Sequence, residues 1–341
     1  MLAVRFHQYG DPAVLKLERV PAPEPAPGWV LVRVRACALN HLDIWNRKGL
    51  PRPVTPLPHI LGADVAGEVA GLGDGVSGLQ TGSRVIINPG ISCGRCHACL
   101  RGQDHHCPEY QVLGNRHPGG YAEYVTVPAA NVTDMPAGLS FSDAASIPLV
   151  FLTAWHMCDR ARLNRGESVL VMGAGGGVGT AAIQVARLHG ARVIAVTGSA
   201  AKAERLTALG ADQVILHGRE DVSARARALT DGEGVDVVIE NVGEAVWPAA
   251  VKSMARGGRL VTCGATSGPH VNINLLHLFA KEQSLLGSYM GSKSDLLDLL
   301  PYVAGGRLRP VVDQVLPLSE AAAAHRLLEE RQQLGKVVLV P

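Results

Sequence analysis

The chain has 341 residues, of which 47% are hydrophobic and 18% charged, and its formal net charge is +2. This balance excludes a disordered chain, because the apolar content is enough to build cores for about two domains, and the lack of basic runs argues against nucleic acid as a partner. We expect a cytoplasmic protein that does not enter a membrane, since the first residues carry no secretory signal and no apolar stretch approaches the ~20 residues that span a bilayer.

Strand patterns dominate residues 1–150. Residues 29–39 (WVLVRVRACAL) alternate as a half-buried strand does, and residues 67–87 have the glycine and aspartate content of a hairpin. From 151 to 290, continuous apolar strands alternate with helical segments, which predicts a parallel sheet covered on both faces. Two helical and two strand-like segments fill residues 291–341. We therefore expect an α/β protein in which 1–150 and 291–341 form a mostly-β domain and 151–290 form a doubly wound domain.

Four cysteines gather within residues 91–108 in the spacing C-x2-C-x2-C-x7-C, at Cys93, Cys96, Cys99 and Cys107. Thiolates at such spacing are typical zinc ligands, and four of them fill a tetrahedral shell completely. A zinc ion held in this way has no open position for water or substrate, so its role would be to fold this lobe. Three histidines inside the cluster are alternative ligands for one position, namely His97, His105 and His106. We predict one structural zinc.

A glycine-rich turn follows the apolar stretch 167–172 (ESVLVM) and leads into a helical segment. Glycine lets backbone N–H groups approach a pyrophosphate, and the start of a helix adds a positive charge. Because a second strand follows the helix where a dinucleotide-binding unit needs it, the turn predicts dinucleotide binding rather than an ordinary connection. The candidate contacts are Gly175, Gly176, Gly177, Val178 and Gly179.

The end of the second strand bears on which dinucleotide binds. NAD-binding proteins usually carry an acidic residue there, which bonds the ribose 2′-hydroxyl. This chain instead has Thr197 and Ser199, followed by Lys202. Hydroxyl groups and an ammonium attract the 2′-phosphate that a carboxylate would repel. We therefore expect NADP(H), while NAD remains possible, and Lys202 with Arg205 could instead form a solvated helix face.

Taken together, these motifs resemble the medium-chain dehydrogenase/reductase family, which includes zinc alcohol dehydrogenases and quinone oxidoreductases. Besides the cysteine lobe and the glycine turn, the resemblance rests on LGADVAGEV (61–69), GGRLVTCG (257–264) and GKVVL (335–339). It implies a GroES-like catalytic domain, an inserted Rossmann domain and an active-site cleft between them. It also implies a homodimer or homotetramer formed through the last Rossmann strand (284–290). The quinone oxidoreductase branch is the most similar, although this chain retains the zinc lobe.

The resemblance also shows where the catalytic zinc ligands of family alcohol dehydrogenases would stand. Those ligands are two cysteines (or a cysteine and an aspartate) and a histidine, and the corresponding positions here are Asn40, Ala63 and Leu149. An amide, a methyl and an isobutyl group cannot replace them, so we expect no catalytic metal. The alternative is a rebuilt site that uses His41, Asp43, His59 and Asp64.

Without a metal, the charge that follows hydride transfer must be delocalised, as on an enolate or a phenolate, and hydrogen-bond donors must stabilise it. The resemblance assigns Asn40 to this role, and it places Trp45 where zinc-free relatives usually carry a tyrosine. Because an indole cannot supply a phenolic proton, solvent or His41 is the expected proton source. Trp45 then either lines an aromatic substrate pocket or packs in the core.

Further coenzyme contacts follow from the expected fold, since ligands bind at the carboxyl ends of parallel strands. We expect Val242, Gly264 and Ser288 beside the nicotinamide, with Thr153 near the entry to the Rossmann domain. The favoured function is an NADP(H)-dependent reductase of quinones or activated C=C and carbonyl compounds, acting on a small molecule without catalytic zinc. The alternatives are an alcohol dehydrogenase with an altered metal site and a nucleotide-binding protein without turnover.

Overall fold

The computed structural model describes residues 1–50, 52–53 and 55–341. The chain forms two units, of which the first comprises Met1–Leu149, Ser292–Ala304 and Pro310–Pro341, and the second Val150–Gly291 and Gly305–Arg309. The short segment Gly305–Arg309, which we expected in the first domain, therefore groups with the second unit. It does so because the Gln184 side chain accepts from the Arg309 backbone N–H and donates to the Arg309 carbonyl, at 2.8 and 2.9 Å.

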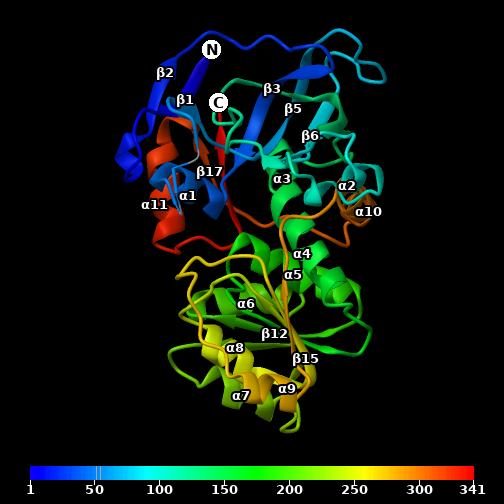
Figure 1. The fold of residues 1–341 in the computed structure, drawn as a ribbon. Helices are drawn as coiled ribbons and strands as arrows, with labels where there is room; N and C mark the ends of the chain where they lie inside the picture. The colour runs from blue at the N-terminus through cyan, green and yellow to red at the C-terminus, as the bar shows by residue number, and fades with distance from the viewer. Residues whose placement is uncertain (51, 54) are drawn as a thin grey trace. The chain divides into compact units, whose positions relative to one another are not determined.

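A seven-stranded sheet forms the centre of the first unit, with the strand order β10-β6-β5-β3-β18-β17 and with β9 also paired to β3. Figure 1 labels β3, β5, β6 and β17 of this sheet. All pairs are antiparallel except β17 with β18. In β3 the valines are buried while Arg33 and Arg35 are exposed, as the alternating pattern predicts. The strands are β3 (Trp29–Ala38), β5 (Asp64–Leu72), β6 (Arg84–Ile87), β9 (Tyr124–Pro128), β10 (Val132–Asp134), β17 (Val312–Pro317) and β18 (Lys336–Val340).

A smaller sheet of the order β2-β1-β4 completes the β-structure around this core. Its strands are β1 (Leu2–Phe6), β2 (Lys16–Arg19) and β4 (His59–Ile60). The helices of this unit are α1 (His41–Lys48), α3 (Phe141–Ala145), α10 (Lys293–Ala304) and α11 (Ala321–Glu329), and the short 3-10 helices are η1 (Pro12–Val14), η3 (Ala129–Asn131) and η4 (Leu318–Glu320). The cysteine lobe contains β7 (Gly90–Ile91), α2 (His97–Leu100), η2 (Asp104–His106) and β8 (Gln111–Val112).

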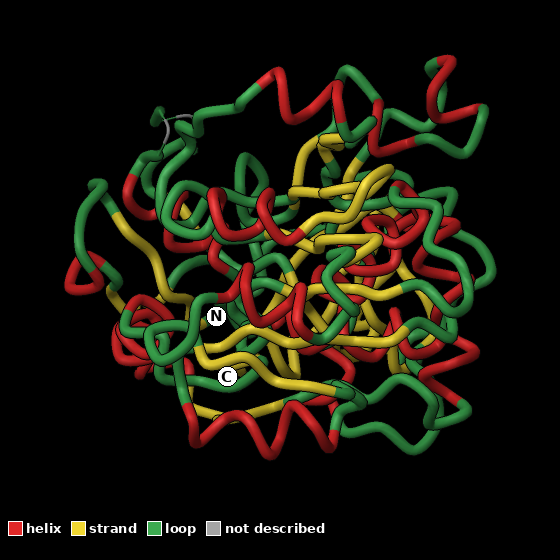
Figure 2. The backbone as a smooth tube through the Cα atoms, turned by 90° about the horizontal axis from the view of Figure 1, so that it is seen from below, coloured by secondary structure: helices red, strands yellow, loops and turns green. Residues whose placement is uncertain are grey.

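The second unit contains a six-stranded parallel sheet with the order β13-β12-β11-β14-β15-β16, of which Figure 1 labels β12 and β15. From β11 the chain adds β12 and β13 on one side and then β14, β15 and β16 on the other. This is the order of a dinucleotide-binding Rossmann fold. All four residues of β11 are buried, as expected for a strand covered on both faces. The strands, yellow in Figure 2, are β11 (Ser168–Val171), β12 (Arg192–Thr197), β13 (Gln213–Leu216), β14 (Val235–Glu240), β15 (Met254–Thr262) and β16 (Ser284–Gly287).

Helices connect these strands and complete the α/β architecture that the sequence predicts. They are α4 (Pro148–Arg160), α5 (Gly177–Leu188), α6 (Ala200–Ala208), α7 (Val222–Ala228), α8 (Trp247–Ser253) and α9 (Leu275–Ala280). Within the described part of the chain, no helix has the length and apolarity needed to cross a membrane.

Candidate active site and zinc lobe

The four cysteines of the lobe lie close enough to share one ion. Their Sγ atoms are all within 4.8 Å of one another, with 4.0 Å between Cys93 and Cys99 and 3.5 Å between Cys96 and Cys99. Thiolates at the usual Zn–S distance of about 2.3 Å stand about 3.8 Å apart in a tetrahedron, so the donor set fits zinc. Among the residues that the structure describes, only these four form such a group of metal-ligating side chains, and the lobe histidines are not part of it.

The lobe is held together by hydrogen bonds from its own backbone, and one buried carboxylate anchors it to the rest of the first unit. Backbone N–H groups of Cys93 and Glu109 donate to the Cys107 sulfur, at 3.4 and 3.3 Å. Asp104, which is buried, accepts a hydrogen bond of 2.9 Å from the backbone N–H of Lys293 at the start of α10. Unfolding of the lobe would therefore break a hydrogen bond at the start of α10.

The positions of the three missing catalytic ligands meet around one carboxylate, that of Asp64. The Asn40 side-chain N–H donates to Asp64 Oδ2 at 2.9 Å, and the Leu149 backbone N–H donates to Asp64 Oδ1 at 2.8 Å. Ala63 precedes Asp64 in the chain and is fully buried. The fold thus brings Asn40, Ala63 and Leu149 to a single place in the first unit.

A buried lysine, which we did not predict, completes this cluster. Lys336 Nζ lies 2.6 Å from Asn40 Oδ1 and 2.9 Å from Asp64 Oδ2, and its side chain is only 3% exposed. The Asp64 carboxylate therefore already has a cationic partner and accepts three N–H donors. A zinc ion needs free thiolate, imidazole or carboxylate ligands, so this donor set does not fit a catalytic zinc.

The candidate ligands of the alternative metal site are engaged separately, and among the described residues they do not come together as a group that could hold a metal ion. His59 Nε2 contacts the Gly114 carbonyl at 3.2 Å, and burial lowers the pKa of its imidazole to about 4. Asp43 accepts the backbone N–H of Asn40 at 2.8 Å and that of Gly62 at 3.1 Å. These bonds use Asp43 to hold the start of α1 and the 61–63 loop in place.

A chain of buried polar groups extends from Asp43 toward the surface. Arg47 can only donate, so it donates to His325 Nδ1 at 3.2 Å, and the neutral ring then donates from Nε2 to the Tyr121 oxygen at 3.2 Å. Burial and the Arg47 charge lower the His325 pKa to about 3, which keeps the ring neutral. The Tyr121 hydroxyl donates to Asp43 at 3.2 Å, and Arg47 also binds Glu329 at 2.7 Å. Burial raises the Asp43 pKa to about 6.

The other two predicted catalytic residues, His41 and Trp45, lie together on α1. Their rings meet edge to face with centroids 5.4 Å apart, and both side chains are half-buried. Burial lowers the pKa of His41 below its ordinary value, and the nearby charges of Arg331 and Lys48 act in the same direction. The neutral form of His41 is therefore favoured, so the ring can pass on a proton from one nitrogen only while it accepts one at the other.

The glycine turn of the second unit is packed closely against its own backbone. Gly173 has a φ of +61°, which favours glycine. A Cβ added at Gly179 would lie 2.5 Å from the Gly173 carbonyl oxygen and 2.6 Å from Ala174 Cα. Gly176 is the N-cap of α5, so Gly177, Val178 and Gly179 form its first turn. Gly175 precedes this cap. The exposed N–H groups of the helix start fit a pyrophosphate.

Residues predicted to contact the nicotinamide follow the carboxyl ends of three strands of the parallel sheet. Val242 follows β14, Gly264 follows β15 and Ser288 follows β16, while Thr153 lies buried in α4. Sequence reasoning missed the buried carboxylate of Glu240, the last residue of β14. It accepts the Val242 and Gly243 backbone N–H groups at 2.5 and 2.7 Å, and so shapes this turn. An acidic residue ending an apolar strand was the signal available.

The end of β12 carries hydroxyl groups and no carboxylate. Thr197 is buried, and its Oγ1 accepts the Ser199 backbone N–H at 3.3 Å. Ser199 is the N-cap of α6, but its side chain makes no capping hydrogen bond. Lys202 lies in the first turn of the same helix. The end of β12 thus brings two hydroxyl groups and one ammonium group into adjacent positions of the chain.

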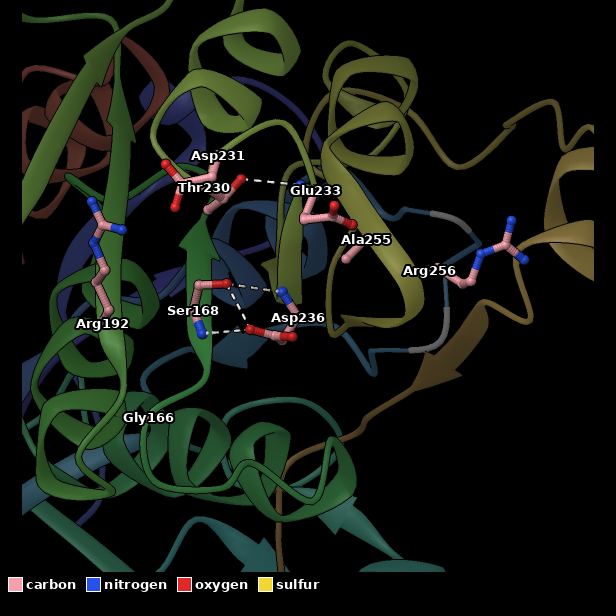
Figure 3. A pocket seen from close by; sticks show the side chains of 10 residues that line it. Gly166, Ser168, Arg192, Thr230, Asp231, Glu233, Asp236, Ala255 and Arg256 are labelled. Atoms are coloured by element: carbon pink, nitrogen blue, oxygen red, sulfur yellow. Dashed lines mark hydrogen bonds between the residues drawn. The ribbon is translucent and has the colours of Figure 1, made fainter.

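A polar pocket of about 400 Å³ lies at the amino-terminal ends of the parallel strands, where β11, β12, β14 and β15 begin (Figure 3). The Ser168 hydroxyl and backbone N–H both donate to Asp236 Oδ2, at 2.7 and 2.8 Å. These bonds join the starts of β11 and β14. Since the glycine turn follows the carboxyl end of β11, this pocket is not the coenzyme site.

Comparison with known proteins assigns the chain to a family. The model of the alcohol dehydrogenase GroES-like domain matches residues 26–137, and that of the zinc-binding dehydrogenase matches residues 177–305. A curated NAD-dependent alcohol dehydrogenase of Sulfolobus acidocaldarius is 34% identical, with 99% of each chain covered. The chain belongs to the zinc alcohol dehydrogenase-like, medium-chain dehydrogenase/reductase family. This medium-chain dehydrogenase/reductase is accordingly an NAD(P)-dependent oxidoreductase.

Relatives with different named activities are similarly close to this medium-chain dehydrogenase/reductase. An acryloyl-coenzyme A reductase of Metallosphaera sedula is 32% identical over 99% of this chain and 98% of its own. A quinone oxidoreductase of Rattus norvegicus is 30% identical over 100% and 98%. A crystal structure described as an NAD-dependent alcohol dehydrogenase is 50% identical, covers 100% of both chains and superimposes with a TM-score of 0.97. The family is therefore shown, whereas the names of its members span several reactions.

Proposed function

We propose that this protein reduces quinones or activated C=C and carbonyl compounds by hydride transfer from NADP(H), with zinc only in the cysteine lobe. The observation that carries the proposal is the cluster of Asn40, Asp64 and Lys336. It supplies N–H donors and one neutralised carboxylate at the place where a catalytic metal would need free ligands. Donors of this kind stabilise a delocalised oxyanion, as the reduction of a conjugated acceptor requires.

The residues of the first unit divide the work of such a reaction. Bound NADPH supplies a hydride to the β-carbon of an enone, which leaves an enolate and NADP⁺, and one proton at the α-carbon completes the reduction. Asn40 contributes a donor toward the enolate oxygen. Solvent supplies the proton, either directly or through His41, whose neutral ring would accept a proton from water at one nitrogen as it gives one up at the other. Trp45 packs against His41 and offers an aromatic wall.

A matched pair of acceptors tests the proposed reaction. We expect NADPH oxidation with but-3-en-2-one to have a kcat/KM on the order of 100-fold above that with butan-2-one, because only the enone spreads the developing charge over a conjugated system. A benzoquinone and a crotonyl thioester extend the panel. An equal or reversed preference would favour the alcohol dehydrogenase, which the names of several relatives suggest. If none of the acceptors in the panel led to oxidation of NADPH, the protein would instead be a nucleotide-binding protein without turnover.

The preference for NADP(H) rests on the end of β12, where Thr197 and Ser199 precede Lys202 and no carboxylate is present. We expect a lower KM for NADPH than for NADH. Ser199→Glu should raise the KM for NADPH by about tenfold, or about 1.4 kcal/mol, because a carboxylate repels the 2′-phosphate. Ser199→Gln, which has the same size without the charge, should have a smaller effect. A wild-type protein with the lower KM for NADH would overturn the preference.

We also propose a homodimer, or a tetramer built from it, joined through β16. This strand is at the edge of the parallel sheet, so its outer side can pair with another strand, although the Gly287 carbonyl already accepts a hydrogen bond of 3.3 Å from Arg160. Apolar side chains nearby are exposed, among them Leu275 and Phe279 on α9, each 67% exposed. A mass from light scattering of twice or four times the chain mass is expected, and a monomer would contradict this proposal.

A further inference from the structure

Lys336 and Asp64 form a buried salt bridge at the centre of the first unit. Lys336 begins β18, Asn40 follows β3 and Asp64 begins β5, on three adjacent strands of the seven-stranded sheet. The pairing of Val338 with Ala38 places Lys336 opposite Asn40 when the register is extended by two residues. Lys336 is 3% exposed and Asp64 is fully buried. Burying such a pair costs desolvation free energy that the pair often fails to recover, so its presence points to another role.

The chemistry of the three side chains fixes the orientation of the Asn40 carboxamide. An ammonium only donates, so the group 2.6 Å from Lys336 Nζ must be the amide oxygen. An ionised carboxylate only accepts, so the group 2.9 Å from Asp64 must be the amide nitrogen. These two contacts together exclude the flipped amide. Without the lysine, the amide oxygen would lose its cationic partner and the carboxamide could rotate.

The hydrogen-bonding groups of this cluster that are not yet used are mostly donors. Asp64 already accepts from Asn40, from Lys336 and from the Leu149 backbone. The second N–H of Asn40 has only a long contact of 3.5 Å, to the Ala38 carbonyl. Lys336 has three N–H bonds, and its two contacts use two of them. The cluster is therefore suited to a ligand that brings an acceptor oxygen.

We propose that Lys336 is a positioning residue of the active site, which holds the Asn40 carboxamide as a hydrogen-bond donor for the oxyanion formed on the reduced acceptor. This role rests on the proposed function, since an enolate or phenolate is the anion to be held. Lys336 acts through Asn40 and Asp64. The ammonium also offsets the Asp64 charge, so that the cluster presents donors without a net negative charge, which would repel the oxyanion.

The test uses a variant in which the buried charge stays balanced. Lys336→Met alone would leave Asp64 charged and unpaired, which could prevent folding. The double variant Lys336→Met/Asp64→Asn removes both charges and keeps similar side-chain volumes. The single variant Lys336→Arg keeps Asp64 and a positive charge at position 336. Lys16→Met, at an exposed position on β2, is the matched control for loss of a lysine. Each variant is compared by thermal unfolding, by steady-state kinetics and by the side-chain amide NMR signal of Asn40.

The proposal predicts that the double variant folds and keeps its KM for NADPH within about twofold, while kcat for the enone falls by ~100-fold, as when an oxyanion donor is lost. The Asn40 signal should move in the double variant and return toward the wild-type position in Lys336→Arg, which should also recover part of kcat. A folded double variant with unchanged kcat, or with an unmoved Asn40 signal, overturns the proposal. A wild-type protein that reduces no conjugated acceptor counts against the proposed function instead, and the Asn40 signal still decides whether Lys336 orients that amide.

Discussion

Replacing Cys96 and Cys99 together by serine is expected to release the zinc ion and to lower the midpoint of thermal unfolding by several degrees. Their sulfur atoms are 3.5 Å apart in a group of four, and two thiolates cannot hold zinc as four do. Because the lobe is bonded to α10 through Asp104, the loss should reach beyond the lobe itself. A loss of 1–2 kcal/mol corresponds to a shift of roughly 2–8 °C for a domain of this size. Differential scanning calorimetry and metal analysis measure the two effects.

His97→Ala is the matched control for this pair of substitutions. His97 is exposed, and it does not belong to the group of sulfur ligands. This variant should keep its zinc and its unfolding midpoint. If it lost the metal instead, a histidine would be one of the ligands, and the assignment of zinc to four cysteines would be wrong. A double cysteine variant that retained a full equivalent of zinc would contradict the assignment as well.

Gly179→Ala is expected to raise the KM for NADPH by about 100-fold or more, which corresponds to about 2.7 kcal/mol. The added Cβ would lie 2.5 Å from a backbone oxygen and 2.6 Å from a backbone Cα, so the glycine turn and the start of α5 must move apart. The N–H groups that approach the pyrophosphate would move with them. Initial rates at varied NADPH and tryptophan fluorescence titration measure the loss.

Gly176→Ala separates this effect from a direct clash with the coenzyme. A Cβ at Gly176 would have its nearest neighbour at 3.6 Å, an ordinary contact, and the backbone there is extended. The variant should therefore unfold at the wild-type temperature, and any loss of affinity would come from the ligand side. If Gly179→Ala bound NADPH as the wild type does, the turn would not be the pyrophosphate site.

Local motifs carried most of what the sequence could predict. The strands of the parallel sheet are short, apolar and separated by helices, so the parallel sheet could be predicted from this alternation, and the family resemblance implied a Rossmann domain. The cysteine cluster and the glycine turn each lie within fewer than twenty residues. Their chemistry therefore depends on spacing along the chain, which a single sequence displays directly.

Contacts between distant residues could not be predicted in the same way. Lys336 and Asn40 are 296 positions apart, and their contact depends on the register of β18 against β3. The motif that contains Lys336 was visible, but only the strand pairing shows which side chain it meets. The same holds for Tyr121 and His325, which are 204 positions apart, and which join Asp43 to Arg47 inside the first unit.

The zinc content of the purified wild-type protein, measured together with its turnover, tests the central claim most directly. We predict one zinc ion per chain, which is lost in the Cys96→Ser/Cys99→Ser variant. We also predict that a chelator strong enough to remove weakly bound metal leaves the rate of enone reduction unchanged. Two zinc ions per chain, with turnover disappearing as the second is removed, would contradict a reaction that relies on the donors of Asn40 and Lys336.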